Sequence, residues 1–548
     1  MSIGNTRQPN EKKPIFSNQI LMILIGVLSI VLVALLIVSG SLFTPDANPD
    51  PTNPQLGSNP ASTPSSSQMP SSSATQPSAT LPPSIPTTAP ITVPTLPPAP
   101  PEGGKYINVG YGHLVEVIQP NVETFDGGKY DDFSHPTNNY LPEGTVDYCA
   151  KDIVYGSGMK YVQLRSGHRV YFDKKVYPFP TGDVYQMVDE VKMSEGWLPD
   201  HNEVGVSSFE IVGHHTVLTM DTMWKAPFYF ETNQSGYANP VSAKDRDYEV
   251  VHVNATYIDI TFCYSTVFNG TITIPSGHPL FRSAQIIKNE YDYTLRLYLR
   301  KTGGFYGWHA YYNDNDQLCF IFLNPTKVTA AENKYGADLT GTKIMLDVGH
   351  GGIDGGAAAY YCATCDKDLM ASDLKNYSKC RTCNTKAQLV ATETELNMAL
   401  ALALKAELES VGATVILNRT EDTIINVNDR QEQLHEIAPD ICIAIHQNSN
   451  DSKSTKGFFS MFFTTWSQSL AQHIRLRTRA SEVYSRSVLQ WSANYFMTRQ
   501  PICPVVLTEN GFMSNETDLT NMLDEVVVQN KAIAIAQGIA DYFLEINQ

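Results

Sequence analysis

Polar residues able to do chemistry stand at the ends of apolar segments in the C-terminal part of the chain. His350 closes "KIMLDVGH", His446 closes "ICIAIH" and Glu509 closes "PVVLTE". Glu393 opens the amphipathic segment that follows the first of them. In an open parallel sheet, the carboxyl ends of the strands and the starts of the following helices lie along one edge. We therefore expect two histidines and two carboxylates to meet at one rim of a sheet.

Such a set of side chains is suited to metal-assisted hydrolysis. Two imidazoles and one carboxylate, with water in the fourth position, form a catalytic zinc site. A second carboxylate that does not bind the metal can accept a proton from the activated water. A single histidine at a strand end is usually a structural residue, so the convergence of four groups is what favours a metal. The surrounding "VGHGGIDGG" allows close backbone approach and lacks the lysine and spacing of a P-loop.

Two Cys-x-x-Cys pairs form a second candidate site, inside a segment at 360–388. The four cysteines are Cys362, Cys365, Cys380 and Cys383. The fourteen residues 366–379 separate the pairs, close to the roughly 15–20 residues typical of Cys₄ zinc sites. Disulfides are the alternative, because the N-terminal sequence places this segment outside the cytosol. A thioredoxin-like redox centre would have one Cys-x-x-Cys pair on a βαβ unit, which this segment does not resemble. A segment so small and polar needs a crosslink to hold its shape.

The strands and helices that must position these residues are predicted from the sequence pattern after residue 331. Apolar strand-like segments ("KIMLDVGH", "ATVILNR", "ICIAIHQN", "PVVLTENG") alternate with amphipathic ones ("ELNMALALALKAELESVG", "VNDRQEQLHEIA"). Helical patterns at 516–523 and 526–546 end the chain. This alternation predicts an α/β domain over 331–548, with a largely parallel sheet and helices on both faces.

Residues 105–330 are predicted to form one or two β-rich domains. Segments such as "KYVQLRSGHRVYF", "TYIDITFCYSTVF" and "YTLRLYLRK" alternate apolar and polar residues or are rich in β-branched and aromatic types. The stretch "HAYYNDNDQLCFIF" predicts a hairpin with Asn-Asp turn residues. The adjacent histidines His214 and His215 are interpreted as structural. The region is expected to bind an extracellular wall or a partner, or to act as a scaffold.

The N-terminal residues predict a membrane anchor and a spacer. Residues 20–43 contain an uncharged apolar run long enough to span a bilayer as one transmembrane helix. Within residues 1–104, Lys and Arg occur only before this run. Residues 1–19 are therefore expected in the cytosol and the rest of the chain outside. A cleaved signal peptide is the alternative, although the run is long for one. Residues 44–104, rich in Pro, Ser and Thr, predict an extended linker without a core.

Overall charge and cysteine content exclude two classes of protein. The chain has 39 Lys and Arg against 56 Asp and Glu, a net charge of −17. That balance argues against a nucleic-acid partner, whose phosphates need cationic neutralisation. Nine cysteines in 548 residues are too few for a fold built on disulfides.

The segments around the candidate site resemble the zinc-dependent N-acetylmuramoyl-L-alanine amidases, a family of cell-wall hydrolases. The resemblance rests on "IMLDVGHGGIDGGA", "ETELNMALALALKAELESVGATVILNRTED", "AIHQNS" and "PVVLTENGFMSNETD", which occur in the family's order. It implies zinc ligands at His350, Glu393 and His446, and a catalytic carboxylate at Glu509. Gly355 stands where the family has a proline, and the cysteine-containing insertion is an addition to the family pattern.

The function implied by this resemblance is hydrolysis of the amide between N-acetylmuramic acid and L-alanine in peptidoglycan, on the outer side of the cell membrane. Asn448 and Arg499 are expected to orient the substrate or to support the oxyanion. The insertion is expected to form one wall of the substrate cleft or to dock a protein regulator. The competing hypotheses are a zinc peptidase or deacetylase acting on another cell-wall amide, and a non-catalytic wall-binding regulator.

Overall fold

The computed structural model describes most of the chain from residue 114 onward. The described ranges are 114–117, 119–125, 136–154, 160–171, 185–187, 202–233, 254–376, 378–484 and 488–548. The predicted tail, anchor and linker at 1–19, 20–43 and 44–104 lie outside these residues. Within the described ranges, no helix has both the length and the apolar character needed to cross a bilayer.

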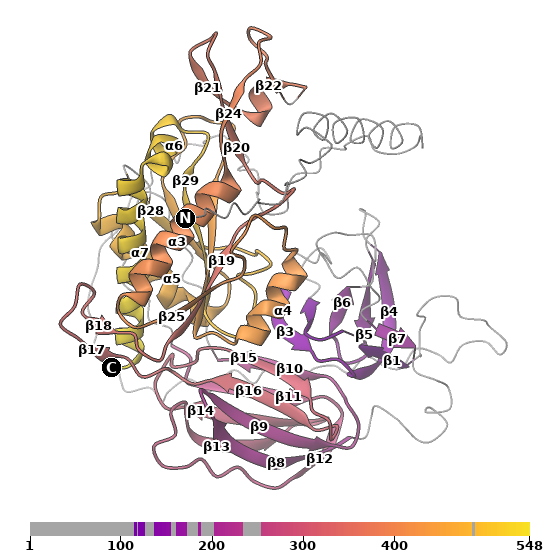
Figure 1. The fold of residues 1–548 in the computed structure, drawn as a ribbon. Helices are drawn as coiled ribbons and strands as arrows, with labels where there is room; N and C mark the ends of the chain where they lie inside the picture. The colour runs from indigo at the N-terminus through magenta and orange to yellow at the C-terminus, as the bar shows by residue number, and fades with distance from the viewer. Residues whose placement is uncertain are drawn as a thin grey trace, which may run out of the picture. The chain divides into compact units, whose positions relative to one another are not determined.

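A six-stranded sheet forms the centre of the C-terminal domain, in the order β25-β19-β26-β29-β27-β28 (Figure 1). The strands are β19 (Lys343–Val348), β25 (Thr414–Leu417), β26 (Ile441–Asn448), β27 (Phe458–Phe462), β28 (Val488–Ser492) and β29 (Val505–Phe512). Neighbouring strands are parallel except β29 and β27, which pair antiparallel. The prediction of an α/β domain with a largely parallel sheet is therefore confirmed.

Three helices cover one face of this sheet, namely α3 (Glu393–Glu409), α5 (Gln468–Ala480) and α7 (Glu525–Ile546). Alternate residues of the central strands, such as Leu346 and Ile443, share a fully buried core with Leu404 of α3. Helices α5 and α7 approach closely at Gly538, where a Cβ atom would lie 2.5 Å from the Cα of Ile474. Burial of this apolar face is the main stabilising term for the domain.

The opposite face of the sheet is covered only in part by a helix. Helix α4 (Val427–Ile437) contributes Leu434, which shares a core with Met345 and Cys442. The same core includes Val505 and apolar residues of the preceding β-sandwich. The prediction of helices on both faces is thus correct only in part, because one short helix cannot bury all the apolar side chains on this side and the β-sandwich supplies the rest.

The β-rich region contains a seven-stranded sheet and a two-sheet sandwich. The first has the order β3-β2-β6-β5-β4-β1-β7, with β1 (Leu114–Val117), β2 (Val122–Phe125), β3 (Pro136–Leu141), β4 (Val146–Val154), β5 (Lys160–Leu164), β6 (Arg169–Tyr171) and β7 (Tyr185–Met187). The sandwich packs sheet β10-β11-β14-β13 against sheet β12-β8-β9-β16-β15. Its strands are β8 (Asn202–Val212), β9 (His215–Thr222), β10 (Phe228–Thr232), β11 (Tyr257–Phe262), β12 (Ser265–Asn269), β13 (Phe281–Lys288), β14 (Tyr293–Leu299), β15 (Trp308–Tyr312) and β16 (Leu318–Leu323).

The hairpin predicted at "HAYYNDNDQLCFIF" is confirmed by the antiparallel pairing of β15 with β16. The side-chain oxygen of Asn313 accepts hydrogen bonds from the backbone of Asn315 and Gln317, at 3.0 Å each, and so closes the turn. A short pair, β17 (Thr329–Ala330) and β18 (Ala337–Asp338), precedes the six-stranded sheet.

A projecting segment, the cysteine arm (residues 358–392), connects β19 to α3 and rises from the rim of the sheet (Figure 1). It contains β20 (Ala358–Cys362), β21 (Lys367–Met370), the 3₁₀ turn η1 (Ala371–Asp373), β22 (Leu374–Lys375), β23 (Lys379–Cys380) and β24 (Gln388–Thr392). The outer strands β21 and β24 both pair with β20. A second 3₁₀ turn, η2 (Thr465–Ser467), precedes α5, and α6 (Glu516–Leu523) follows β29.

Candidate functional site

The sheet and its first helix bring three of the predicted residues to one rim. His350 follows β19 in a left-handed conformation, with φ 57°. His446 lies in β26, the strand beside β19. Glu393 is the first residue of α3, whose start is fixed by a capping box between Thr392 and Glu395. The parallel order of the strands therefore places all three side chains at the edge that the sequence predicts.

The donor atoms of these residues lie close enough to share one ion. His350 Nε2 is 3.2 Å and His446 Nδ1 is 3.1 Å from Glu393 Oε1. One donor atom from each residue lies within 4.8 Å of the others, and the two imidazole rings meet edge to face at 5.0 Å. Glu393 is 4 % exposed, while the two histidines are half-buried. A buried carboxylate between two imidazoles is a donor set that occurs in catalytic zinc sites.

The electrostatics of this cluster favour a positive charge between the three groups. Burial alone would raise the pKa of Glu393, but hydrogen bonds with His350 and His446 outweigh it and hold that pKa well below its usual range. Burial also opposes charge on His350, yet its bonds to Asp354 and Glu393 raise its pKa to about 10. A divalent cation would supply the same positive charge in place of protons.

A second layer of hydrogen bonds orients the donor groups. Asp354 Oδ2 lies 2.8 Å from Nδ1 of His350, which leaves Nε2 directed at Glu393. The backbone N–H groups of Ala357 and Gln447 donate to the two carboxylate oxygens of Glu393, at 2.9 and 3.1 Å. Such outer partners fix the tautomer and orientation of metal ligands. Sequence reasoning missed Asp354, although a carboxylate four residues after a candidate ligand was a signal that could have found it.

Two glycines make room for the cluster. A Cβ on Gly349 would collide with the imidazole of His446, at 2.6 Å from both ring nitrogens. A Cβ on Gly356 would lie 2.5 Å from Oε2 of Glu393 and 2.6 Å from Cδ2 of His350. Glycine is needed at both positions because the backbone itself lines the site.

Glu509 stands next to the three-residue cluster. It lies in β29 and is the register partner of His446 in the parallel pairing of β26 with β29. Register partners on adjacent strands present their side chains to the same side of a sheet. Asn510 reinforces the junction by donating its side-chain N–H to the backbone oxygen of His446 at 3.0 Å. The half-buried carboxylate of Glu509 is thus placed to serve a molecule held at the rim.

The two remaining predicted residues lie in different surroundings. Asn448 ends β26, and its backbone oxygen accepts a hydrogen bond from the N–H of Met513 at 2.8 Å. Arg499 forms a bidentate ion pair with Glu123, with Nε–Oε1 at 2.6 Å and Nη2–Oε2 at 3.0 Å. Its guanidinium therefore serves a contact with the seven-stranded sheet, and any contact of Arg499 with a substrate stays a prediction.

The four cysteines of the arm meet in a second group. One Sγ from each lies within 4.8 Å of all the others. The sulfur atoms of Cys362 and Cys383 are 3.4 Å apart, and those of Cys365 and Cys380 are 3.8 Å apart. The structure therefore brings together both Cys-x-x-Cys pairs, without a bond between the sulfurs.

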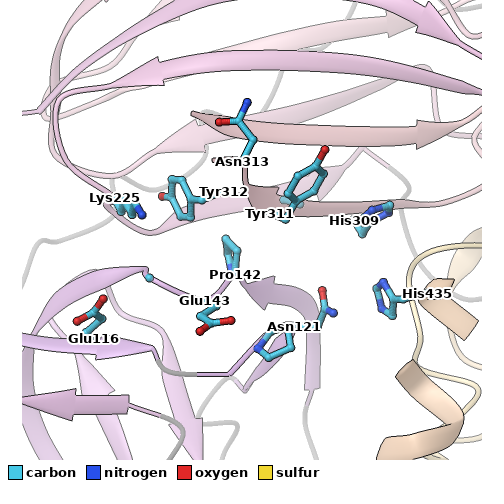
Figure 2. A pocket seen from close by; sticks show the side chains of 13 residues that line it. Glu116, Asn121, Pro142, Glu143, Lys225, His309, Tyr311, Tyr312, Asn313 and His435 are labelled. Carbon is cyan, nitrogen blue, oxygen red and sulfur yellow. The ribbon is translucent and has the colours of Figure 1, made fainter. Parts of the chain in front are cut away.

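A pocket of about 460 Å³ lies outside both groups, and Figure 2 shows its lining. His309 of β15 and His435 of α4 meet there, with ring centroids 5.4 Å apart in an edge-to-face arrangement. Burial lowers the pKa of His309 to about 3 and that of His435 to about 4. Both imidazoles are therefore neutral at physiological pH, and sequence reasoning had singled out neither of them.

The comparisons with known proteins concern the C-terminal domain. Residues 344–541 match the family model described as N-acetylmuramoyl-L-alanine amidase. A probable cell wall amidase, LytH of Staphylococcus aureus, is 28% identical over 216 residues. That match covers 39% of this chain and 63% of the relative's length.

Two solved amidase structures are among those that match part of this chain. The catalytic domain of CwlV from Bacillus (Paenibacillus) polymyxa var. colistinus is 23% identical, with a TM-score of 0.31, covering 37% of this chain and 99% of that one. CwlD from Clostridioides difficile, solved in complex with the GerS lipoprotein, is 22% identical, with a TM-score of 0.29 and coverages of 37% and 99%. The family-model match makes residues 344–541 of this chain similar to the N-acetylmuramoyl-L-alanine amidases.

Proposed function

We propose that this chain hydrolyses the amide between the lactyl group of N-acetylmuramic acid and L-alanine in peptidoglycan. The observation that carries the proposal is the meeting of His350, Glu393 and His446 at the rim of the sheet, with Glu509 beside them. A metal-binding group of this composition, next to a carboxylate that is not part of it, has the parts needed for hydrolysis by activated water. The choice of this amide bond is supported by the match of the same domain to the N-acetylmuramoyl-L-alanine amidase family model.

The cofactor proposed for this site is zinc, held by His350, Glu393 and His446. The fit rests on the donor set of two nitrogens and one oxygen, and on the glycine-lined space at Gly349 and Gly356. When bound, zinc supplies a Lewis acid that polarises the scissile carbonyl and lowers the pKa of water. The histidines must be neutral to bind it, so binding releases protons from the cluster.

The residues of the chain supply the proton transfers and the positioning. Glu509 accepts a proton from the attacking water and returns it to the nitrogen of the leaving L-alanine. Asp354 holds His350 in one tautomer, and the backbone N–H groups around Glu393 keep its carboxylate in place. Asn448, at the end of the same strand as His446, is proposed to orient the substrate.

Replacing Glu509 by Gln tests this assignment. The variant keeps the shape of the side chain but cannot accept the proton, so turnover of purified peptidoglycan should fall at least about 100-fold. Zinc content should stay at the native value, because Glu509 is not among the donors. The matched control is Glu525→Gln, an exposed charge loss at the start of α7, which should leave zinc content unchanged and turnover far above that of Glu509→Gln. Full activity of Glu509→Gln contradicts the proposal.

We also propose that the domain acts outside the cell membrane, tethered by the apolar run at 20–43 and the linker at 44–104. The support is the sequence pattern alone: one uncharged run, basic residues before it, and a spacer rich in proline. Protease added to intact cells should remove the catalytic domain and leave the first residues protected. Protection of the whole chain contradicts this topology. A second zinc ion at the four cysteines is part of the same proposal, as is a role of the cysteine arm either as a wall of the substrate cleft or as a docking site for a protein regulator.

A further inference from the structure

The cysteine arm has too few apolar residues to hold its own fold. Its buried cluster consists of Cys362, Leu369, Leu374, Cys380 and Ala387, of which two are cysteines. Segments of this size seldom bury enough apolar surface to stay folded without a disulfide or a bound metal. The position of the arm therefore depends on whatever links its sulfur atoms.

The two Cys-x-x-Cys pairs lie in tight turns that share one backbone feature. The residue after each second cysteine, Asp366 and Asn384, is in the left-handed region, with φ 50° and 59°. In the first turn the N–H of Cys365 bonds the carbonyl of Cys362, and in the second the N–H of Asn384 bonds that of Cys380. Such paired turns direct two sulfurs each toward a common point, as in Cys₄ zinc sites.

The sulfur separations match a shared ion better than two covalent bonds. Four Zn–S bonds of about 2.3 Å in a tetrahedron place the sulfurs about 3.8 Å apart. The separations of 3.4 and 3.8 Å are close to that value, whereas a disulfide needs about 2.05 Å. The hydroxyl of Thr385 adds a polar contact to two of the sulfurs, 2.8 Å from Cys383 and 3.5 Å from Cys362, which suits thiolates.

The arm forms one wall of a pocket where it meets the C-terminal domain. This pocket, of about 530 Å³, is lined by Tyr361 and Asp368 on the arm and by Lys453 and Glu516 on the domain. The lining includes Met513, which directly follows β29, the strand that holds Glu509. The N–H of Met513 also donates to the backbone oxygen of Asn448, two residues after His446, so this part of the lining adjoins the strand ends that carry the candidate site.

The lining of this pocket carries both signs of charge. Lys453 contacts the arm through Asp373, with Nζ–Oδ2 at 3.0 Å, and through the backbone oxygen of Asp368 at 3.2 Å. Glu516 is exposed at the start of α6. The sugars of a peptidoglycan strand carry hydroxyl and acetamide groups, whereas its stem peptides carry carboxylates and amines. A lining of mixed charge is complementary to the peptide portion.

We propose that the four cysteines of the arm bind one zinc ion, and that this ion holds the arm as a wall of a pocket for the stem peptide. The identity of the peptide rests on the proposed function, whereas the metal site does not. Zinc here is structural, with four protein ligands and no open position, so it takes no part in the hydrolysis.

Metal and thiol analysis of the full chain tests the site without any activity measurement. Two zinc ions per chain are expected, falling to one in Cys380→Ser and to one in His446→Ala. The control Cys319→Ser removes a buried thiol of the sandwich and should keep two. Zinc unchanged by Cys380→Ser overturns the metal site.

Thiol counting on the native chain covers the case in which Cys380→Ser does not fold. After denaturation with a chelator and without reductant, all nine cysteines should react with an alkylating reagent. Five reactive cysteines would show that the four are paired as disulfides, and would overturn the proposal.

Substrate length tests the role of the pocket. Glu516→Gln should raise KM about fivefold for a muramoyl tripeptide that ends in L-lysine, the effect of one lost charged contact. KM should stay unchanged for the muramoyl dipeptide L-Ala-D-Glu, which is too short to present that amine. Equal effects on both substrates overturn the peptide pocket. A native chain that binds two zinc ions but hydrolyses neither substrate refutes the proposed function and leaves the cysteine site standing.

Discussion

Gly349→Ala is the substitution that should most cleanly separate folding from metal binding. The added Cβ would meet the imidazole of His446 at 2.6 Å from its ring nitrogens. Cε1 of the ring would be closer still, and ordinary contact begins near 3.4 Å, so the ring has to move by about 1 Å. A shift of that size takes His446 out of reach of an ion shared with Glu393 and His350. Loss of well-placed support for a metal ligand lowers metal affinity about 10–100-fold, and loss of a ligand lowers it further.

The assay for this prediction is competition for zinc with a chromogenic chelator, followed by turnover of labelled peptidoglycan. We expect zinc affinity to fall at least about 100-fold and turnover to fall in parallel. Gly355→Ala is the matched control in the same loop, because a Cβ there would have only Thr392 nearby, at 3.8 Å. If Gly349→Ala binds zinc as tightly as Gly355→Ala, the proposed arrangement of ligands is wrong.

Three further outcomes are expected. Asp354→Asn should lower zinc affinity about 10-fold through loss of the bond that orients His350; an unchanged chelator titration contradicts this role. Acid should destabilise the fold, because burial lowers the folded-state pKa of His435 to about 4. The unfolded chain therefore binds more protons than the folded chain between pH 6.5 and 4, and the urea midpoint of unfolding should fall across that window. A smaller fall is expected in His435→Gln. Gly538→Ala should destabilise by about 1–3 kcal/mol, because its Cβ would lie 2.5 Å from Cα of Ile474; an unchanged melting temperature refutes the close helix packing.

The rim of the sheet could be predicted from the sequence because it follows from chain direction alone. Parallel strands end at one edge, so residues that close "KIMLDVGH" and "ICIAIH" must be neighbours once those strands pair. The structure pairs them, and His350, His446 and the helix start at Glu393 come together. The cysteine pairs were also predictable as a group, since their spacing is local and both turns lie in one short segment.

Contacts between distant parts of the chain could not be predicted from the sequence in the same way. The apolar pattern of β26 shows that Cys442 is buried but not that a β-sandwich covers it. The ion pair of Arg499 with Glu123 joins residues 376 positions apart, and nothing near either residue indicates its partner. The pairing of His309 with His435 is of the same kind. Such contacts depend on how preformed units pack, which periodicity along the chain does not encode.

The central claim is that this domain cuts one particular amide bond by means of the cluster at His350, Glu393 and His446. Digestion of purified peptidoglycan by the zinc-loaded chain, followed by mass spectrometry and labelling of new amino groups, tests it most directly. The account predicts intact stem peptides with a new amino terminus at L-alanine, and glycan strands with free lactyl carboxylates. New amino groups on any other residue, or on the sugars, would contradict it.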